Sequence, residues 1–181
     1  MTESGDIGEL LTRLLAEGEH QTYPPASAEE VGRTEAALDR ALPDSYKTFV
    51  SRFSNGAYLF LLQEVSAVGE GNAQIRAIQD IDRIGEGAPD EAIPFREGGE
   101  TRYANLVPFG LDSNGNEWCF VAEPGRAGNE YAVAYFDTGG RKLYGKLDGF
   151  TEWLSVLVER QDEVIRTLYD DDVIYDELLL G

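Results

Sequence analysis

Cysteine and histidine are almost absent from this chain of 181 residues, which contains one of each. Cys119 cannot form a disulfide within the chain, and this favours a reducing compartment. Cys119 and His20 together cannot fill the four positions of an ordinary zinc site. No apolar run approaches the roughly 20 residues of a membrane span, and the first residues lack the features of a secretory signal. These absences predict a cytoplasmic protein that has no cofactor and does not bind membranes.

The sequence contains few candidate catalytic residues. A Ser-His-Asp or Cys-His arrangement would have to use His20, which sits in a proline-containing connector, residues 19–26, where a surface position is expected. Cys119 lies in the middle of an apparent strand, where a small buried hydrophobe is expected. The glycine pairs fit neither a phosphate-binding loop nor a dinucleotide fingerprint. We therefore predict that the protein is not an enzyme.

Positive charge is also scarce. The sequence has 15 basic and 34 acidic residues, a formal net charge of −19. Nucleic acids are poor partners for such a chain, because phosphate binding depends on clusters of basic side chains. A basic protein partner remains compatible with the charge. The alternative is that the acidity only keeps the protein soluble.

The chain is organised around a helical stretch, residues 27–56. Ser27 and Glu30 have the spacing of a capping box, and apolar residues then recur at helical intervals. The Leu42-Pro43 step should end this helix and begin a second one. The second helix carries a wide apolar stripe from Tyr46 to Phe53, and Asn55-Gly56 is expected to be its left-handed C-terminal cap.

The remaining elements indicate an α+β fold. Residues 6–17 predict an opening helix capped by Asp6, and 58–62 predict a buried strand. From 106 to 146 the apolar period is two with short turns, which predicts an antiparallel β-meander. Asp148 is expected to cap a last helix. We predict N-terminal helices and a C-terminal helix packed on the meander sheet, in a single domain of residues 1–181.

Residues 63–105 carry the least regular pattern. Glycines punctuate the segment, and its isoleucines fit either a short helix or a strand with a helical turn. Residues 85–104 are predicted to form a surface loop. A loop of that length in a compact domain usually has a role, so we expect part of it to move or to contact a partner.

The loop after the first meander strand partly matches a calcium-binding motif. Asp112, Asn114, Asn116 and Glu123 occupy positions 1, 3, 5 and 12 of an EF-hand-like count. That motif needs glycine at position 6 for its sharp turn, and Glu117 stands there. It also needs a following helix, whereas the next residues have the pattern of a strand. We therefore expect no metal at this loop.

Several of these motifs together resemble the SUKH superfamily, which includes fungal cell-wall assembly and killer-toxin-resistance proteins and many bacterial immunity proteins. The family-like positions are Leu42, Pro43, Tyr46, Asn55, Gly56, Pro108, Phe109, Gly110, Gly115, Trp118 and Trp153. The resemblance spans residues 27–160 and leaves an acidic extension, 161–181. Asp39 stands where the family usually has glycine, which suggests a longer first helix. Asn116 replaces the family's usual acidic residue after the turn glycine.

The resemblance implies a non-catalytic binding protein. It points to an immunity protein that binds and blocks a toxin domain of nuclease or deaminase type; the alternative is an intracellular regulatory scaffold of the cell-wall assembly type. The expected partner is a basic toxin domain, with the protein itself a monomer or weak dimer. We select two groups of candidate partner-binding residues, all of them acidic except one asparagine. Near the sheet they are Asp112, Asn114 and Glu117, and in the extension they are Asp170, Asp171 and Asp172.

Overall fold

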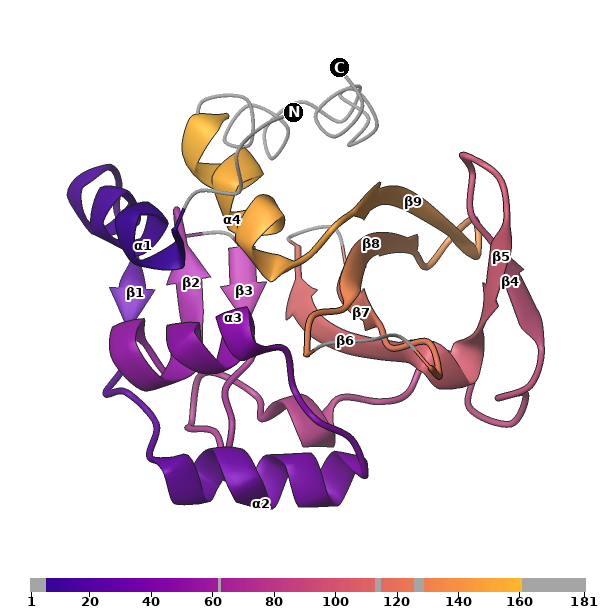
Figure 1. Ribbon diagram of the computed structural model, residues 1–181, viewed down its shortest axis with the longest axis horizontal. Coiled ribbons are helices and arrows are strands. Elements are labelled where there is room, and N and C mark those ends of the chain that lie inside the picture. Colours follow the sequence, from indigo (N-terminus) through magenta and orange to yellow (C-terminus); the bar gives the residue numbers. More distant parts are fainter. Residues whose placement is uncertain (1–5, 62, 113–114, 126–128, 161–181) are drawn as a thin grey trace.

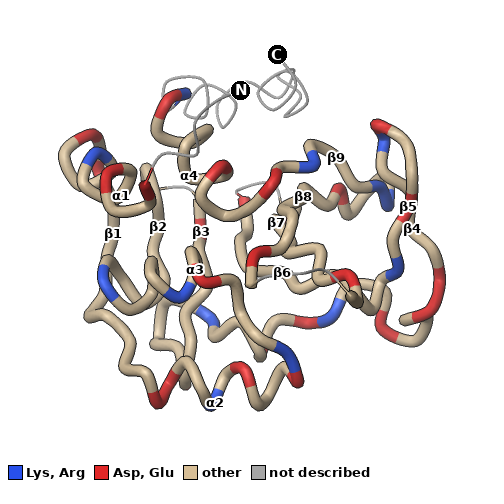
Figure 2. The backbone as a smooth tube through the Cα atoms, in the orientation of Figure 1, with Lys and Arg blue, Asp and Glu red and all other residues tan. Residues whose placement is uncertain are grey.

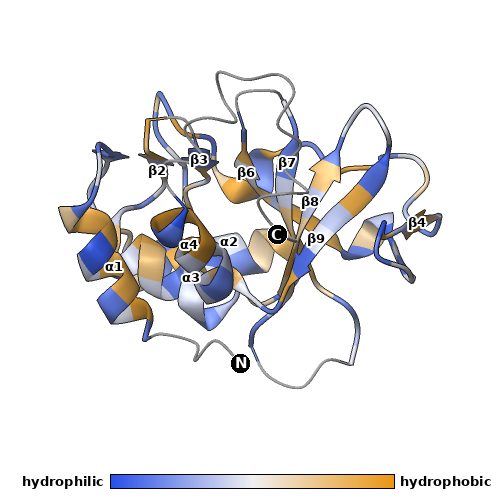
Figure 3. Ribbon diagram, turned by 90° about the horizontal axis from the view of Figure 1, so that it is seen from above, coloured by the Kyte–Doolittle hydropathy of each residue, from blue (hydrophilic) through white to orange (hydrophobic). Residues whose placement is uncertain are grey.

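A computed structural model describes residues 6–61, 63–112, 115–125 and 129–160, in which helices pack on a seven-stranded antiparallel sheet (Figure 1). Seen from above, α1, α3 and α4 lie on one side of the sheet (Figure 3). The predicted α+β class, with N-terminal helices and a C-terminal helix, is confirmed. Asn114, the extension 161–181 and its three candidate aspartates, Asp170, Asp171 and Asp172, lie outside the described residues.

The first two helices begin where the sequence predicts, because polar side chains cap them. Asp6 accepts a hydrogen bond from the Gly8 N–H at the start of α1 (Ile7–Ala16). At α2 (Ala28–Leu38), Ser27 and Glu30 exchange side chain–backbone hydrogen bonds, so the capping box is confirmed. The expected lengthening of this helix is wrong. It ends at Leu38, because Asp39 adopts a left-handed conformation with φ 53°, which aspartate tolerates better than most residues.

The second predicted helix changes its winding halfway. Residues Asp44–Thr48 are α-helical (α3), and Phe49–Phe53 continue as a π-helical turn. Ser54, which follows, is extended, so the helix does not reach the predicted cap at Asn55-Gly56.

Asn55 and Gly56 have a different structural role from the one predicted. The Asn55 side chain accepts a hydrogen bond from the Val68 N–H at 2.8 Å and donates one to the Val68 carbonyl at 3.2 Å. Gly56 is left-handed as expected, with φ 78°, but it lies in the turn that leads into β2. The pair therefore joins the helical stretch to the loop after β3.

The sheet has the strand order β1-β2-β3-β6-β7-β8-β9, with every neighbouring pair antiparallel. Its last four strands are consecutive in the chain, which confirms the predicted meander. The strand predicted over 58–62 is shorter, because Phe60 and Leu61 have positive φ angles and turn the chain back. The strands are β1 (Gln21–Thr22), β2 (Ala57–Leu59), β3 (Gln63–Val65), β6 (Leu106–Leu111), β7 (Glu117–Val121), β8 (Ala132–Asp137) and β9 (Lys142–Leu147).

The surface loop predicted for residues 85–104 is instead a structured hairpin. Strands β4 (Ala92–Pro94) and β5 (Glu100–Arg102) pair with each other, and short 3₁₀ turns flank the region at Ile78–Asp80 and Tyr103–Asn105. Ile93 packs with Phe95 and Tyr103 into a second apolar core on the sheet face opposite the helices. The hairpin also reaches the edge strand β9, where the Arg96 N–H donates to the Leu143 carbonyl at 2.9 Å.

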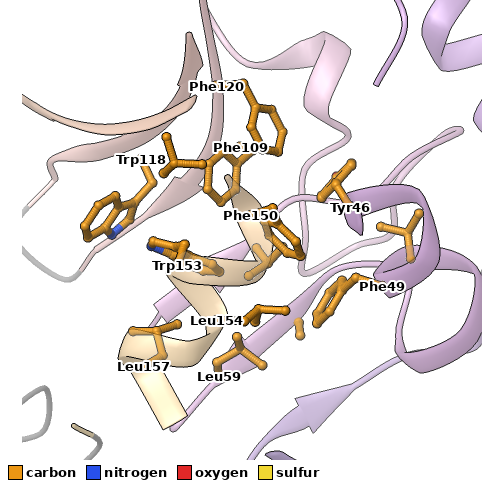
Figure 4. Close-up of a cluster of buried hydrophobic side chains, with 14 of the residues drawn as sticks. Tyr46, Phe49, Leu59, Phe109, Trp118, Phe120, Phe150, Trp153, Leu154 and Leu157 are labelled. Carbon is orange, nitrogen blue, oxygen red and sulfur yellow. The ribbon is translucent and has the colours of Figure 1, made fainter. Parts of the chain in front are cut away.

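The main core on the helical face is built from aromatic rings (Figure 4). Phe109 and Phe120 stack with their ring centroids 4.2 Å apart, and Trp153 meets Phe109 edge-on at 5.1 Å. Trp153 comes from α4 (Phe150–Glu159). The backbone N-cap of this helix is Gly149, not the predicted Asp148, whose N–H instead donates to the Glu152 carboxylate. The contact between Trp153 and Phe109 thus packs α4 against β6.

Candidate functional site

The sheet face opposite the helices is only partly covered by the β4–β5 hairpin. Strand register places Tyr58, Glu64, Leu111 and Glu117 in one row across β2, β3, β6 and β7. Side chains of opposed residues in neighbouring strands lie on the same face of a sheet. The hairpin's apolar residues pack over β6 to β9. The other half of this face carries a polar, aromatic surface, the tyrosine–glutamate face, made of Tyr23, Tyr58, Glu64, Gln74, Arg76 and Glu117.

Gln74 holds the two tyrosines of this face in place. The Tyr23 hydroxyl donates to Gln74 Oε1 at 2.8 Å, and the Gln21 side-chain amide donates to the same oxygen at 2.8 Å. The Tyr58 hydroxyl donates to the Gln74 backbone carbonyl at 2.9 Å. Both rings are therefore fixed before any partner arrives, and their ordering costs less entropy on binding.

Two carboxylates of the face share the charge of one arginine. Arg76 Nε lies 3.6 Å from Glu64 Oε1, an ion-pair distance that is too long for a hydrogen bond. Burial raises the pKa of Glu64 and of Glu117, and the Arg76 charge opposes the rise in both. The nearby Asp82 adds to the rise in the Glu117 pKa.

Glu64 has an oxygen on this face that is ion-paired with Arg76 but not hydrogen-bonded. Its Oε1 atom is screened from solvent and has no hydrogen-bond partner. A buried carboxylate oxygen gains when a donor or a cation reaches it, because an unmet acceptor carries the full desolvation cost. The arrangement therefore suits a partner that brings an N–H group or a positive charge.

The tyrosine–glutamate face is suited to binding rather than to catalysis, since its six residues include no nucleophile paired with a base. Cys119 is part of the second core, and burial raises the pKa of its thiol well above the usual value. A neutral thiol of this kind is a poor nucleophile. His20 was expected at the surface, but it is half-buried. Its ring bonds the backbone of Leu14 and of Phe60, so it ties α1 to the β2–β3 turn.

Of the candidates selected from charge, the structure brings Glu117 to this face and puts Asp112 elsewhere. Asp112 is 5% exposed. Its carboxylate accepts hydrogen bonds from the Tyr135 hydroxyl and from the Asn116 N–H. The structural role of Asp112 is thus to shape the β6–β7 turn. Figure 2 shows why charge alone selects poorly, since acidic positions are spread over the helices, the hairpin and the loops.

The structure also separates the residues of the calcium count. Asp112 precedes β7 and Glu123 follows it, so the five residues of that strand, about 17 Å long at 3.4 Å per residue, lie between them. Within the described ranges, no group of three histidine, cysteine or acidic side chains is placed to hold a metal ion. Nor do the described helices include one with the length and apolarity for crossing a bilayer.

Sequence reasoning missed most of the tyrosine–glutamate face. The sequence predicts Tyr58 in a buried strand, 58–62, and Tyr23 in the connector, 19–26. A strand alternation that starts at Tyr58, with Leu59 pointing to the helices, would have placed the tyrosine on the opposite face. Arg76 and Glu64 come together through a loop that no sequence pattern describes.

The comparisons with known proteins agree with the motif analysis. A model of the SMI1 / KNR4 family (SUKH-1) matches residues 25–156, close to the span 27–160 expected from the motifs. The match covers well over half of the chain, and it confirms the predicted superfamily. A search of curated proteins finds no match. The family assignment supports a non-catalytic protein of the SUKH type.

Proposed function

The chain belongs to the SMI1 / KNR4 family (SUKH-1), and from this premise we propose that it is an immunity protein that neutralises a cognate bacterial toxin by direct binding. The toxin would be a basic domain of the nuclease or deaminase type. The protein would act in the cytoplasm, stoichiometrically and without chemistry of its own. The two proteins would form an inactive complex in which the toxin's nucleic-acid site is blocked.

The observation that carries the proposal is the composition of the tyrosine–glutamate face. Tyrosine and arginine are the residue types that most often dominate binding energy at interfaces. Here Tyr23 and Tyr58 are fixed by Gln74, and Arg76 is half-exposed beside them. The Glu64 Oε1 atom, which is not hydrogen-bonded, and the partly buried carboxylate of Glu117 supply acceptors for a basic toxin.

The net charge of −19 supports the same partner through a different effect. Long-range attraction between an acidic protein and a basic one speeds their encounter without adding contacts. Close contacts at the face would then determine how slowly the complex dissociates. The two contributions can be measured separately, because salt weakens the first much more than the second.

The test is binding kinetics between this protein and the products of neighbouring genes. Tyr58→Ala and Glu117→Gln should each raise the dissociation rate by about tenfold or more if these side chains lie at the centre of the interface. Glu29→Gln is the matched control, since Glu29 is an exposed residue of α2 outside the face. It should change the association rate slightly and the dissociation rate not at all.

Two outcomes would contradict the proposal. Binding by the Tyr58 and Glu117 variants with wild-type kinetics would remove the face from the interface. No binding to any neighbouring gene product would remove the immunity role and favour the regulatory scaffold function.

A further inference from the structure

A cavity of about 430 Å³ lies between the end of α2 and the start of β6, away from the tyrosine–glutamate face. Its size falls within the roughly 300–1,000 Å³ typical of small-molecule sites. The apolar part of its wall comes from α2, the 3₁₀ turn Ile78–Asp80, the loop after it and β6. These residues are Leu38, Ile78, Ile81, Ile84, Leu106 and Val107.

Two polar side chains in the cavity wall have atoms without partners. Arg40 uses one guanidinium nitrogen, Nη2, to donate to the Ala104 carbonyl at 3.3 Å, whereas Nη1 is screened from solvent and has no hydrogen-bond partner. Gln79 donates its amide nitrogen to the Gly69 carbonyl, and its Oε1 atom is likewise screened and unpartnered. Buried polar groups normally have hydrogen-bond partners, and a buried group without one carries the cost of its desolvation.

We propose that this cavity binds a small molecule with an apolar body and a carboxylate group, which the Arg40 guanidinium recognises. A carboxylate oxygen would supply the acceptor that Arg40 Nη1 lacks, in a charge-assisted hydrogen bond. The apolar side chains of the wall would take the body of the ligand. An N–H or O–H group on that body would satisfy Gln79 Oε1. The inference goes beyond the proposed function and does not depend on it.

The cavity is held open by contacts behind its wall. Tyr103 lines the cavity, and Arg141 holds its ring in place. The Arg141 guanidinium donates a hydrogen bond of 3.1 Å to the Tyr103 hydroxyl and lies 5.7 Å from the centroid of the ring. Gly85, another residue of the cavity wall, packs directly against the same ring. Its φ angle is 69°, and an added Cβ would lie only 2.4 Å from Tyr103 Cγ. The shape is therefore preformed, which lowers the cost of binding.

The acidity of the whole chain does not prevent an anion from binding here. Charges more than about 10 Å away are largely screened at 0.1 M salt, so the charges close to Arg40 determine whether an anion binds in the cavity. Arg83 also lines the cavity and adds a second positive charge, against the single carboxylate of Glu86 among the lining residues. A guanidinium in a partly buried site interacts more strongly with an anion than one in water does.

The experiment is a titration of the full-length isotope-labelled protein with octanoate, followed by its backbone amide resonances in NMR spectra. Octanoate has an apolar chain and a carboxylate, and octanamide is its uncharged match. Octanoate should shift the resonances of residues 78–87 and 104–107 in a saturable way. Octanamide should bind at least about tenfold more weakly, because its oxygen is neutral and cannot form an ion pair with the Arg40 guanidinium.

Variants test the role of each part of the wall. Arg40→Gln should weaken octanoate binding at least about tenfold. Arg33→Gln, at an exposed position of α2 outside the cavity wall, should leave the binding unchanged. Arg40→Lys keeps the charge and should retain more binding than Arg40→Gln. Ala37→Phe, at an exposed position of the cavity mouth, should block entry without disturbing the core.

The spectra also report whether each variant is folded, so a loss of binding is not confused with a loss of structure. Absence of saturable shifts with octanoate would overturn the proposal. So would equal affinity for octanoate and octanamide, or unchanged binding by both folded variants, Arg40→Gln and Ala37→Phe. Shifts centred on the exposed side chains of Leu15 and Leu61 would show adsorption to surface leucines instead, and would overturn it as well.

Discussion

The Tyr135 hydroxyl donates a hydrogen bond to the buried carboxylate of Asp112, linking the middle of β8 to the turn after β6. The other oxygen of the same carboxylate accepts the Asn116 N–H at 2.9 Å. One acidic side chain thus fixes both the shape of the turn and its position against the sheet. Asp112, which the sequence suggests as a surface residue for partner binding, is instead a buried structural residue.

Removing the Tyr135 hydroxyl should destabilise the fold. Hydrogen bonds to charged groups contribute about 1.5–3 kcal/mol, so Tyr135→Phe should lower the free energy of unfolding by a similar amount. Tyr144→Phe is the matched control. Tyr144 is the cross-strand neighbour of Tyr135, and its hydroxyl makes no hydrogen bond to any residue that the structure describes. Chemical denaturation measures both, and equal losses would show that the bond to Asp112 contributes nothing specific.

Gly56→Val should be more disruptive than the same change at Gly87. Both glycines have positive φ angles, 78° and 93°, so both variants suffer backbone strain of about 1–2 kcal/mol. At Gly56 an added Cβ would also lie 2.6 Å from Ile75 Cγ2 and 3.1 Å from the Val65 carbonyl oxygen, whereas at Gly87 nothing lies within 4 Å. The denaturation midpoint of the Gly56 variant should therefore fall further. An unchanged midpoint would show that the β2 entrance adapts to the side chain.

The bond between His20 and Phe60 predicts a dependence on pH. His20 Nδ1 accepts the Phe60 N–H at 2.9 Å, so the ring is neutral in the folded protein, and burial lowers its pKa from 6.5. The unfolded chain then binds a proton more readily than the folded one. This contribution to stability is complete above pH 6.5 and is lost as the pH falls towards the lowered pKa.

The measurement is the free energy of unfolding at several pH values, for the wild type and for His20→Gln. Burial raises the pKa of Glu64 and Glu117, which makes the fold more stable as the pH falls. Both residues are present in the wild type and in the variant, so their effect cancels in the comparison. The wild type should lose more stability than the variant between pH 7.5 and the lowered pKa. Parallel pH profiles would mean that His20 does not titrate differently on folding.

The acidic extension should affect how fast a toxin binds. Changing Asp170, Asp171 and Asp172 together to asparagine removes three negative charges from residues 161–181. If the extension only steers the partner, the association rate should fall more than the dissociation rate rises, and the difference should disappear at high salt. Stopped-flow mixing at two ionic strengths measures this. A higher dissociation rate would mean instead that the extension lies in the interface.

Calcium should not change the stability of the protein. Asp112 and Glu123, the first and last residues of the EF-hand-like count, lie at opposite ends of β7, and the Asp112 carboxylate is already hydrogen-bonded in the turn. Thermal melts with added calcium and with a chelator should coincide. A shift of many degrees would contradict this expectation, because a ligand that binds the folded state raises its melting temperature.

The helices and the meander could be predicted because local chemistry decides them. A capping box at Ser27 and Glu30 fixes a helix start whatever lies around it, and a period of two from 106 to 146 leaves few alternatives to strands. The stripe from Tyr46 to Phe53 likewise predicts burial, and Tyr46 and Phe49 are fully buried.

The remaining features depend on contacts between distant residues. The strands of the β4–β5 hairpin have three residues each, too few for a period to emerge, and Ile93 is buried only because the hairpin folds onto the sheet. Glu64 and Arg76 meet across a loop. The end of the second helix was misplaced because Asn55 bonds Val68, which comes 13 residues later and offers the asparagine an alternative to capping.

The two borders of the large sheet are both poor templates for another strand. On one side β1 has two residues, and Pro24 and Pro25, which lack a backbone N–H, follow soon after it. On the other side the β4–β5 hairpin occupies the backbone of β9 at Leu143, and the Glu97 carboxylate accepts the Gly145 N–H at 2.7 Å. Open sheet edges are where chains add to one another in aggregates and fibrils. We therefore expect concentrated solutions of this protein to resist edge-to-edge aggregation.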